Sequence, residues 1–141
     1  MEIKIKYWNG MGSLALIEQG DWIDLRSRVT IELATGNYYE IPLGVAMKLP
    51  DGYEAIVVPR SSTFKKYGII QTNSIGIIDN SYCGDNDEWK MPVIATRKTA
   101  IHAGDRICQF RIQKKMTKPT LKTVSHLSDK DRGGFGSTGE N

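Results

Sequence analysis

The sequence has little cysteine and no large excess of charge of either sign. Its 141 residues include only Cys83 and Cys108, which have neither the spacing of a zinc site nor the number needed for a disulfide framework, so a reducing cytoplasm is expected. Nineteen basic and sixteen acidic residues leave a net charge of +3. That balance argues against direct nucleic-acid binding, although a local cationic pocket for a small anion fits it.

Long hydrophobic runs are also missing. No stretch of about 18 apolar residues is present to span a membrane. Residues 1–6 alternate Ile with charged residues, which is unlike the apolar centre of a signal peptide. No segment has the 10–12 periodic residues of a typical helix. The best helical segment, residues 61–67, is only about two turns long, with Ser61 at its start as an N-cap.

The sequence does contain many short segments that alternate like strands. They cover residues 3–7, 20–25, 29–33, 38–49, 53–58, 68–78, 89–96, 106–112 and 121–127. Residues 50–52 (Pro-Asp-Gly) are expected to join the segments on either side as a strand pair. Short strands separated by glycine turns predict an all-β fold, either an antiparallel sandwich, a barrel or a jelly roll, with one short helix.

The chain length suits one domain followed by a short tail. From Ser128 the composition changes to Gly, Ser, Asp and Lys, and Phe135 is the one large apolar residue left. Such a segment cannot build a core. We therefore expect residues 1–127 to form the β domain and residues 128–141 to form a mobile C-terminal arm.

Residues 68–85 carry the most promising chemistry. A run of β-branched residues ends at Asp79-Asn80-Ser81, which is typical of a turn. A hairpin here would hold the carboxylate of Asp79 and the hydroxyl of Tyr82 on a rigid backbone. Those groups suit binding of a flat polar ring and activation of a water molecule beside it. A structural hairpin with a solvated aspartate is the alternative reading.

Two further segments suggest anion binding. Arg60, Ser61 and Ser62 lie where a strand ends and the short helix begins, so free N–H groups and a guanidinium are available to a phosphate. In the arm, Arg132, Ser137 and Thr138 surround Phe135, and the flanking glycines allow close approach to phosphate oxygens. A simple N-cap and an ordinary flexible linker are the alternatives.

Gln109, Asp24 and Asp85 are further candidates. Gln109 points to the opposite side of its strand from Cys108, as a solvated polar residue or as a placed hydrogen-bond donor. Asp24 and Asp85 are candidate acids, although acids in turns are usually turn formers.

Five segments, in this order, resemble the five motifs of the homotrimeric deoxyuridine triphosphatases (dUTPases). They are Asp24-Leu25, residues 59–62, residues 73–84, residues 104–109 and residues 133–139. Together they span nearly the whole chain. One departure concerns the arm: the family places an arginine five residues before the phenylalanine, where this chain has Lys130, whereas Arg132 lies three before it. Either residue is a candidate for the arginine's role.

The resemblance implies a jelly-roll dUTPase fold, homotrimers with shared active sites, and hydrolysis of dUTP to dUMP and pyrophosphate. Such a reaction limits uracil incorporation into DNA and supplies dUMP for thymidylate synthesis. Asp79 would be the general base, and Gln109 would hold the attacking water or an α-phosphate oxygen. Mg²⁺ would be the cofactor, bound to the triphosphate without a direct protein ligand, with Asp24 contacting its waters.

The remaining implied roles concern substrate binding. Tyr82 would pack under the deoxyribose, while Asn73 and the backbone of Gly76, Ile77 and Ile78 would read the uracil edge. Phe135 would stack on the base as the arm closes. The phosphate chain would be bound by Arg60, Ser61, Ser62, Arg132, Gly136, Ser137 and Thr138.

Two alternatives have a different function on the same scaffold. A dCTP deaminase needs a glutamate in the strand after the hairpin, and residues 89–96 contain none. A nucleotide-binding regulatory protein with little turnover is disfavoured by the presence of Asp79 and of the complete arm. An additional protein partner is compatible with the sequence, and the acidic segment 85–88 would be its contact, although a solvated turn is the simpler interpretation.

Overall fold

The computed structural model describes residues 1–16 and 19–136, and these residues form an almost entirely β structure. The elements in chain order are β1 (Lys4–Tyr7), β2 (Ile23–Arg26), β3 (Ile31–Leu33), β4 (Tyr38–Pro42), β5 (Val45–Lys48), β6 (Tyr53–Pro59), α1 (Thr63–Tyr67), β7 (Ile69–Gln71), β8 (Gly76–Ile78), β9 (Lys90–Ala95), β10 (Thr99–Ile101) and β11 (Arg106–Lys114). The prediction of an all-β fold with one short helix is confirmed.

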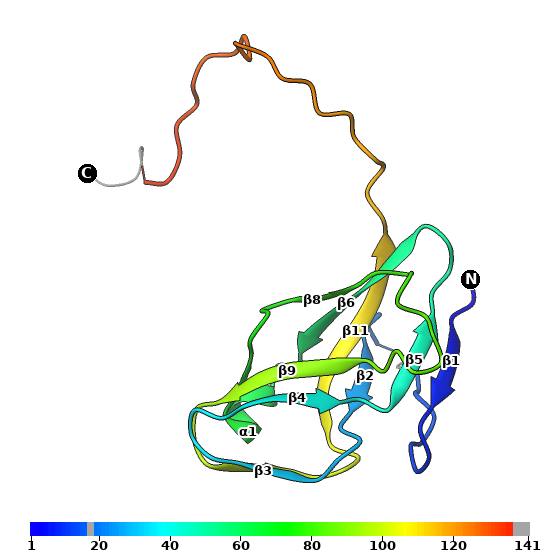
Figure 1. Ribbon diagram of the computed structural model, residues 1–141. Helices are drawn as coiled ribbons and strands as arrows, with labels where there is room; N and C mark the ends of the chain where they lie inside the picture. Colours follow the sequence, from blue (N-terminus) through cyan, green and yellow to red (C-terminus); the bar gives the residue numbers. More distant parts are fainter. Residues whose placement is uncertain (17–18, 137–141) are drawn as a thin grey trace.

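Two sheets face each other across the core. One has the strand order β2-β11-β6-β8 and the other the order β4-β9-β7, while β1-β5 and β3-β10 form two-stranded ribbons. The registered pairs are all antiparallel. In Figure 1, β4 and β9 cross in front of β2 and β11.

The core lies between these layers because alternate residues of each strand point inward. In β9, Met91, Val93 and Ala95 are buried, whereas Lys90 and Ile94 face outward. The ring of Trp89 meets that of Phe110 edge to face, with centroids 5.2 Å apart and planes at 82°. Such a pair stabilises the fold by about 1 kcal/mol beyond the contribution of the apolar area that it buries. The pair joins the start of β9 to β11 and so ties the two sheets together.

The predicted strand pair across residues 50–52 is wrong. The turn itself is present, because the amide of Tyr53 donates to the carbonyl of Pro50 at 3.2 Å. However, β5 pairs with β1, while β6 pairs with β11 and β8. The segment 38–49 is also divided, because the chain turns at Gly44 with φ +68°. A local turn signal specifies a reversal of the chain but not the partner of the strand that follows.

The segment 68–78, which was predicted as one strand, is likewise two strands in two different sheets. β7 pairs with β9 and β8 pairs with β6, and the chain crosses between them through residues 72–75. Ser74 there has φ 59°. This crossing brings the residues after β8 beside both sheets.

The short helix and the segment 121–127 also differ from their predictions. α1 begins at Thr63, and its N-cap is Ser62, which makes no side-chain cap hydrogen bond. Residues 121–127 form no strand, and Leu121 and Leu127 are almost fully exposed. The chain leaves the body at the end of β11 and extends away from it (Figure 1). Among the described residues, no helix is long and apolar enough to cross a membrane.

Candidate active site

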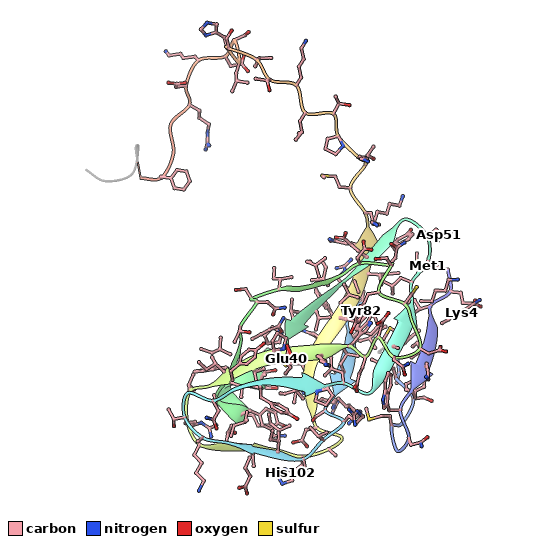
Figure 2. The ribbon with its side chains drawn as sticks, viewed as in Figure 1. Met1, Lys4, Glu40, Asp51, Tyr82 and His102 are labelled. Carbon is pink, nitrogen blue, oxygen red and sulfur yellow. The ribbon has the colours of Figure 1, made fainter. Side chains whose placement is uncertain are left out.

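A cleft of about 350 Å³ opens between β8, the turn that follows it, and the β4-β9 pair. Six residues predicted from the sequence line it: Asn73, Gly76, Ile77, Ile78, Asp79 and Tyr82. Glu40, Lys90 and Pro92 line it from β4 and β9. Figure 2 labels Tyr82 and Glu40, which come from the turn after β8 and from β4.

β8 offers its backbone to this cleft. It is the last strand of its sheet, and within residues 1–16 and 19–136 it pairs only with β6, so the N–H and C=O groups on its other edge are available to bind an extended or planar polar partner. A Cβ added to Gly76 would lie 3.5 Å from the amide nitrogen of Asn73 and 3.4 Å from Val57 Cβ. These are ordinary van der Waals distances, so Gly76 lies in direct contact range of the Asn73 amide.

Gln71 is a cleft residue that the sequence reasoning missed. It is buried, and its Nε2 donates to the carbonyl of Val57 at 3.1 Å. That bond fixes the orientation of the amide and leaves Oε1 without a protein partner. The signal available in the sequence was a polar residue facing inward in an otherwise apolar strand, between the buried Ile69 and the loop.

Asp79 lies at the mouth of the cleft with its carboxylate held from both sides. Ser81 donates to Oδ2 from its backbone N–H at 2.9 Å and from its hydroxyl. Lys115 Nζ donates to Oδ1 at 2.9 Å. The Ser81 hydrogen bonds, followed by that of Lys115, hold the pKa of Asp79 well below its ordinary value. Asp79 is therefore a carboxylate at neutral pH, with its side chain about half exposed.

Tyr82 is anchored by its hydroxyl, which donates to the carbonyl of Glu88 at 2.8 Å. Its ring remains partly exposed on the cleft side. Burial, together with the nearby charges of Asp87 and Glu88, raises the pKa of Tyr82. The group therefore stays a neutral hydrogen-bond donor.

The interpretation of residues 85–88 as a solvated acidic turn is wrong for Glu88. Asp87 stays within the turn, where it accepts a hydrogen bond from the amide of Gly84 at 2.7 Å. Glu88 is only 7% exposed and forms a two-point ion pair with Arg28, with distances of 2.7 and 3.0 Å. A buried carboxylate needs such partners, and they come from parts of the sequence far from the turn.

A second group of predicted residues meets at the other end of β6. Arg60 Nε lies 3.0 Å from Asp24 Oδ1, and Arg106 Nη1 lies 3.3 Å from Asp24 Oδ2. Gln109 Nε2 donates to the carbonyl of Pro59 at 3.2 Å. Ser61 and Ser62 are exposed beside them. This arrangement brings together three of the five predicted motifs in one cationic cluster.

The two groups are separated within the chain. Ala55 of β6 pairs with Ile78, the residue before Asp79, whereas Val58 pairs with Gln109. Three residues of strand span roughly 10 Å, and Arg60 lies further along in the same direction. Asp79 and Gln109 of one chain therefore do not meet at one water molecule.

The arm is not placed over the cleft. Arg132, Phe135 and Gly136 are exposed, and Lys130 is exposed as well. Ser137 and Thr138 lie outside the described residues.

No ready-made cage for a cation is found in the described chain (1–16 and 19–136), where no three His, Cys, Asp or Glu side chains come together. Asp24 is already paired with two arginines.

Comparison with known proteins gives a consistent result. The dUTPase family profile matches residues 18–139. The chain is 56% identical over 140 residues to the SPbeta prophage-derived deoxyuridine 5'-triphosphate nucleotidohydrolase YosS of Bacillus subtilis, covering 99% of each chain.

Solved structures share the fold at low identity. A mutant dUTPase of Staphylococcus bacteriophage 80alpha with dUpNHpp superposes with a TM-score of 0.79 at 20% identity, covering 99% of both chains. A mutant dUTPase from phage phi11 of S. aureus, described with a structural Mg(II) ion, superposes with a TM-score of 0.75 at 18% identity, covering 90% of this chain and 99% of the other.

Proposed function

The chain belongs to the dUTPase family and hydrolyses dUTP, and we propose that the cleft beside β8 holds the deoxyuridine while the Asp24–Arg60–Gln109 cluster of a second subunit holds the phosphate chain. The observation that carries this assignment is the convergence of five predicted binding residues and the predicted general base on one cleft. The products are dUMP and pyrophosphate, so the reaction limits uracil incorporation into DNA and supplies dUMP for thymidylate synthesis.

Base recognition rests on the free edge of β8. The backbone of Gly76, Ile77 and Ile78 reads the edge of uracil, with the amide of Asn73 beside it. Cytosine exchanges a donor for an acceptor at this edge and would leave buried polar groups unpaired, which a hydrogen-bonding site rejects strongly. Tyr82 packs under the sugar and leaves no space for a 2′-hydroxyl.

The chemical step depends on Asp79. Its ionised carboxylate orients a water molecule and takes its proton as the water attacks the α-phosphorus. Gln109 of the second subunit holds that water or an α-phosphate oxygen, and Arg60, Ser61 and Ser62 bind the phosphate chain. Phe135 stacks on the base as the arm, residues 128–141, closes, with Arg132 and Gly136 reaching the phosphates. The roles given to Ser137 and Thr138 are proposed on the motif alone.

Mg²⁺ is proposed as the cofactor. When bound to the triphosphate it would neutralise phosphate charge. Asp24 would contact its waters, because this carboxylate lies in the phosphate-binding cluster and is held in place by Arg60 and Arg106. The phage phi11 protein, which shares this fold, is described with a structural Mg(II) ion, and this supports the choice of magnesium.

A trimer with shared sites is proposed for two reasons. The separation of Asp79 from Gln109 along β6 leaves each chain with two incomplete half-sites. The outer face of the four-stranded sheet also has an apolar pair to cover, the exposed Ile77 and its half-exposed register partner Ile56, beside polar residues such as Arg111 and Gln113. We further propose a cytoplasmic location, which suits two cysteines that are both free.

The substrate range tests the proposal. We expect kcat/KM for dUTP to exceed that for dCTP, dTTP or UTP by at least about a hundredfold, measured as pyrophosphate release from each nucleotide. Equal rates for dUTP and UTP would contradict the role of Tyr82. Equal rates for dUTP and dCTP would contradict the role of β8.

A further inference from the structure

The support of the Tyr82 ring extends well beyond the cleft. The Tyr82 hydroxyl is bound to the backbone carbonyl of Glu88. This carbonyl cannot shift easily, because the next residue, Trp89, is completely buried and its amide donates to Val45 at 2.8 Å. The carbonyl of Trp89 in turn accepts from Leu43 at 2.9 Å.

The side chain of Glu88 fixes the same residue from the other side. Its two carboxylate oxygens bind Nε and Nη2 of Arg28, and Oε2 also accepts from the amide of Gly44 at 2.8 Å. The hydrogen bonding that Arg28 donates to the Glu88 carboxylate is the largest factor that raises the pKa of Arg28. Three donors thus hold a carboxylate that lines the cleft.

This ion pair is costly to build as a device for stability alone. Removing a carboxylate from water carries a large desolvation penalty, and an apolar pair of similar volume often stabilises a fold at least as well. The pair does provide a fixed position for its residues, since a two-point Arg–carboxylate contact restricts both side chains. What it fixes here is the residue that anchors Tyr82.

We propose that Arg28 and Glu88 are positioning residues that set the preference for deoxyribose over ribose, because they hold the Glu88 carbonyl that orients the Tyr82 ring. Neither residue lies in a segment that matched a family motif: Arg28 follows the first motif and Glu88 follows the third. The inference rests on the role proposed for Tyr82 in excluding a 2′-hydroxyl. A ring that tilts by even a small amount would admit ribose.

The test measures kcat/KM for dUTP and UTP in matched variants of the full chain. In Arg28→Met we expect the ratio of kcat/KM for UTP to kcat/KM for dUTP to rise about fivefold. This is the factor that corresponds to loss of one hydrogen bond, here the bond from Tyr82 to the Glu88 carbonyl. The kcat for dUTP should stay within about twofold of wild type. Arg28→Lys keeps the charge but loses the two-point contact, so its ratio should fall between those of the wild type and Arg28→Met. Tyr82→Phe keeps the ring, loses only the anchor, and should raise the ratio by a similar factor.

Arg26→Met is the matched control. Arg26 is exposed, lies two residues before Arg28, and donates to the carbonyl of Gly104 instead of Glu88, so the ratio should not change. If Arg28→Met lowers the unfolding temperature too far for assay, the double variant Arg28→Met/Glu88→Met also removes the buried carboxylate that Arg28→Met leaves without its ion-pair partner, and should show the same rise.

The outcomes separate this inference from the proposed role of Tyr82. If Tyr82→Ala leaves the ratio unchanged, Tyr82 does not select the sugar and both ideas fail. If Tyr82→Ala raises the ratio while Tyr82→Phe and the assayable Arg28 variant do not, the positioning inference alone is overturned.

Discussion

Asp79 shows at the scale of one residue how a turn can prepare a base. Ser81 binds one oxygen of its carboxylate and Lys115 binds the other. Because the folded-state pKa is depressed, these contacts contribute to stability above the unfolded value near 3.9, and the contribution is lost as the pH falls through the folded pKa. The acid limb of the activity profile should therefore not report Asp79 at any pH where the protein works.

Asp79→Asn tests this residue directly. The substitution keeps the size of the side chain but removes the base, and the amide can accept from only one of Ser81 and Lys115, so we expect kcat to fall by a factor on the order of 10²–10⁴. Binding of dUpNHpp, measured by calorimetry, should be retained. Near-normal turnover in this variant would assign the base to Asp24 or Asp85 instead.

The sequence was informative about residues that act through their own turn or strand. Asn73, Asp79 and Tyr82 were predicted to share a site, and they line one cleft. Glu88 was misjudged and Arg28 was not singled out, because their significance depends on each other across 60 residues. Burial of a charge cannot be deduced from its neighbours in the sequence when its partner lies in another element.

At the scale of elements, strand existence was easier to predict than strand partners. The alternation in residues 106–112 identified β11 correctly, and β11 pairs with both β2 and β6. The Pro50–Gly52 turn suggested a hairpin that does not form, and the three-residue β10 was too short to give a periodic signal. Pairing is decided by which faces must be buried together, and a single strand does not contain that information.

The arm is the element whose removal should separate stability from activity. Residues from Ser128 onward contain one large apolar side chain, Phe135, and the described ones make no core contact. We expect truncation after residue 127 to leave the unfolding temperature and the oligomeric state unchanged. An arm that closes as proposed would exclude water and position phosphates, so kcat should fall by a factor on the order of 10²–10³.

Single substitutions in the arm refine that result. Phe135→Ala should lower kcat less than truncation does. If Arg132 reaches the phosphates, Arg132→Ala should lower kcat more than Lys130→Ala does. A larger loss in Lys130→Ala would give the arginine's role to Lys130. Full turnover by the truncated protein would show that the arm is not a lid.

At the scale of the whole molecule, the proposed active site would be completed only by association of subunits. Asp79 follows the strand that pairs with β6 near Ala55. Arg60 and Gln109 lie near the other end of β6, at Val58 and Pro59. A symmetric ring of subunits can bring the first end of one chain to the second end of the next. The exposed side chains of Leu121 and Leu127 would also gain a surface to cover them in such an assembly.

Complementation between two inactive variants tests this arrangement. Asp79→Asn and Gln109→Ala should each be inactive alone. When they are coexpressed with different tags and purified as mixed trimers, one of the three sites in each mixed trimer, about a third of all sites, should combine an intact Asp79 with an intact Gln109, and activity should reappear to that extent. Sedimentation equilibrium should give a trimer for every variant, which serves as the control for assembly. If both residues act in the same subunit, mixing restores nothing, because every site then contains one of the two substitutions. A wild-type chain that sediments as a fully active monomer would exclude shared sites in the same way.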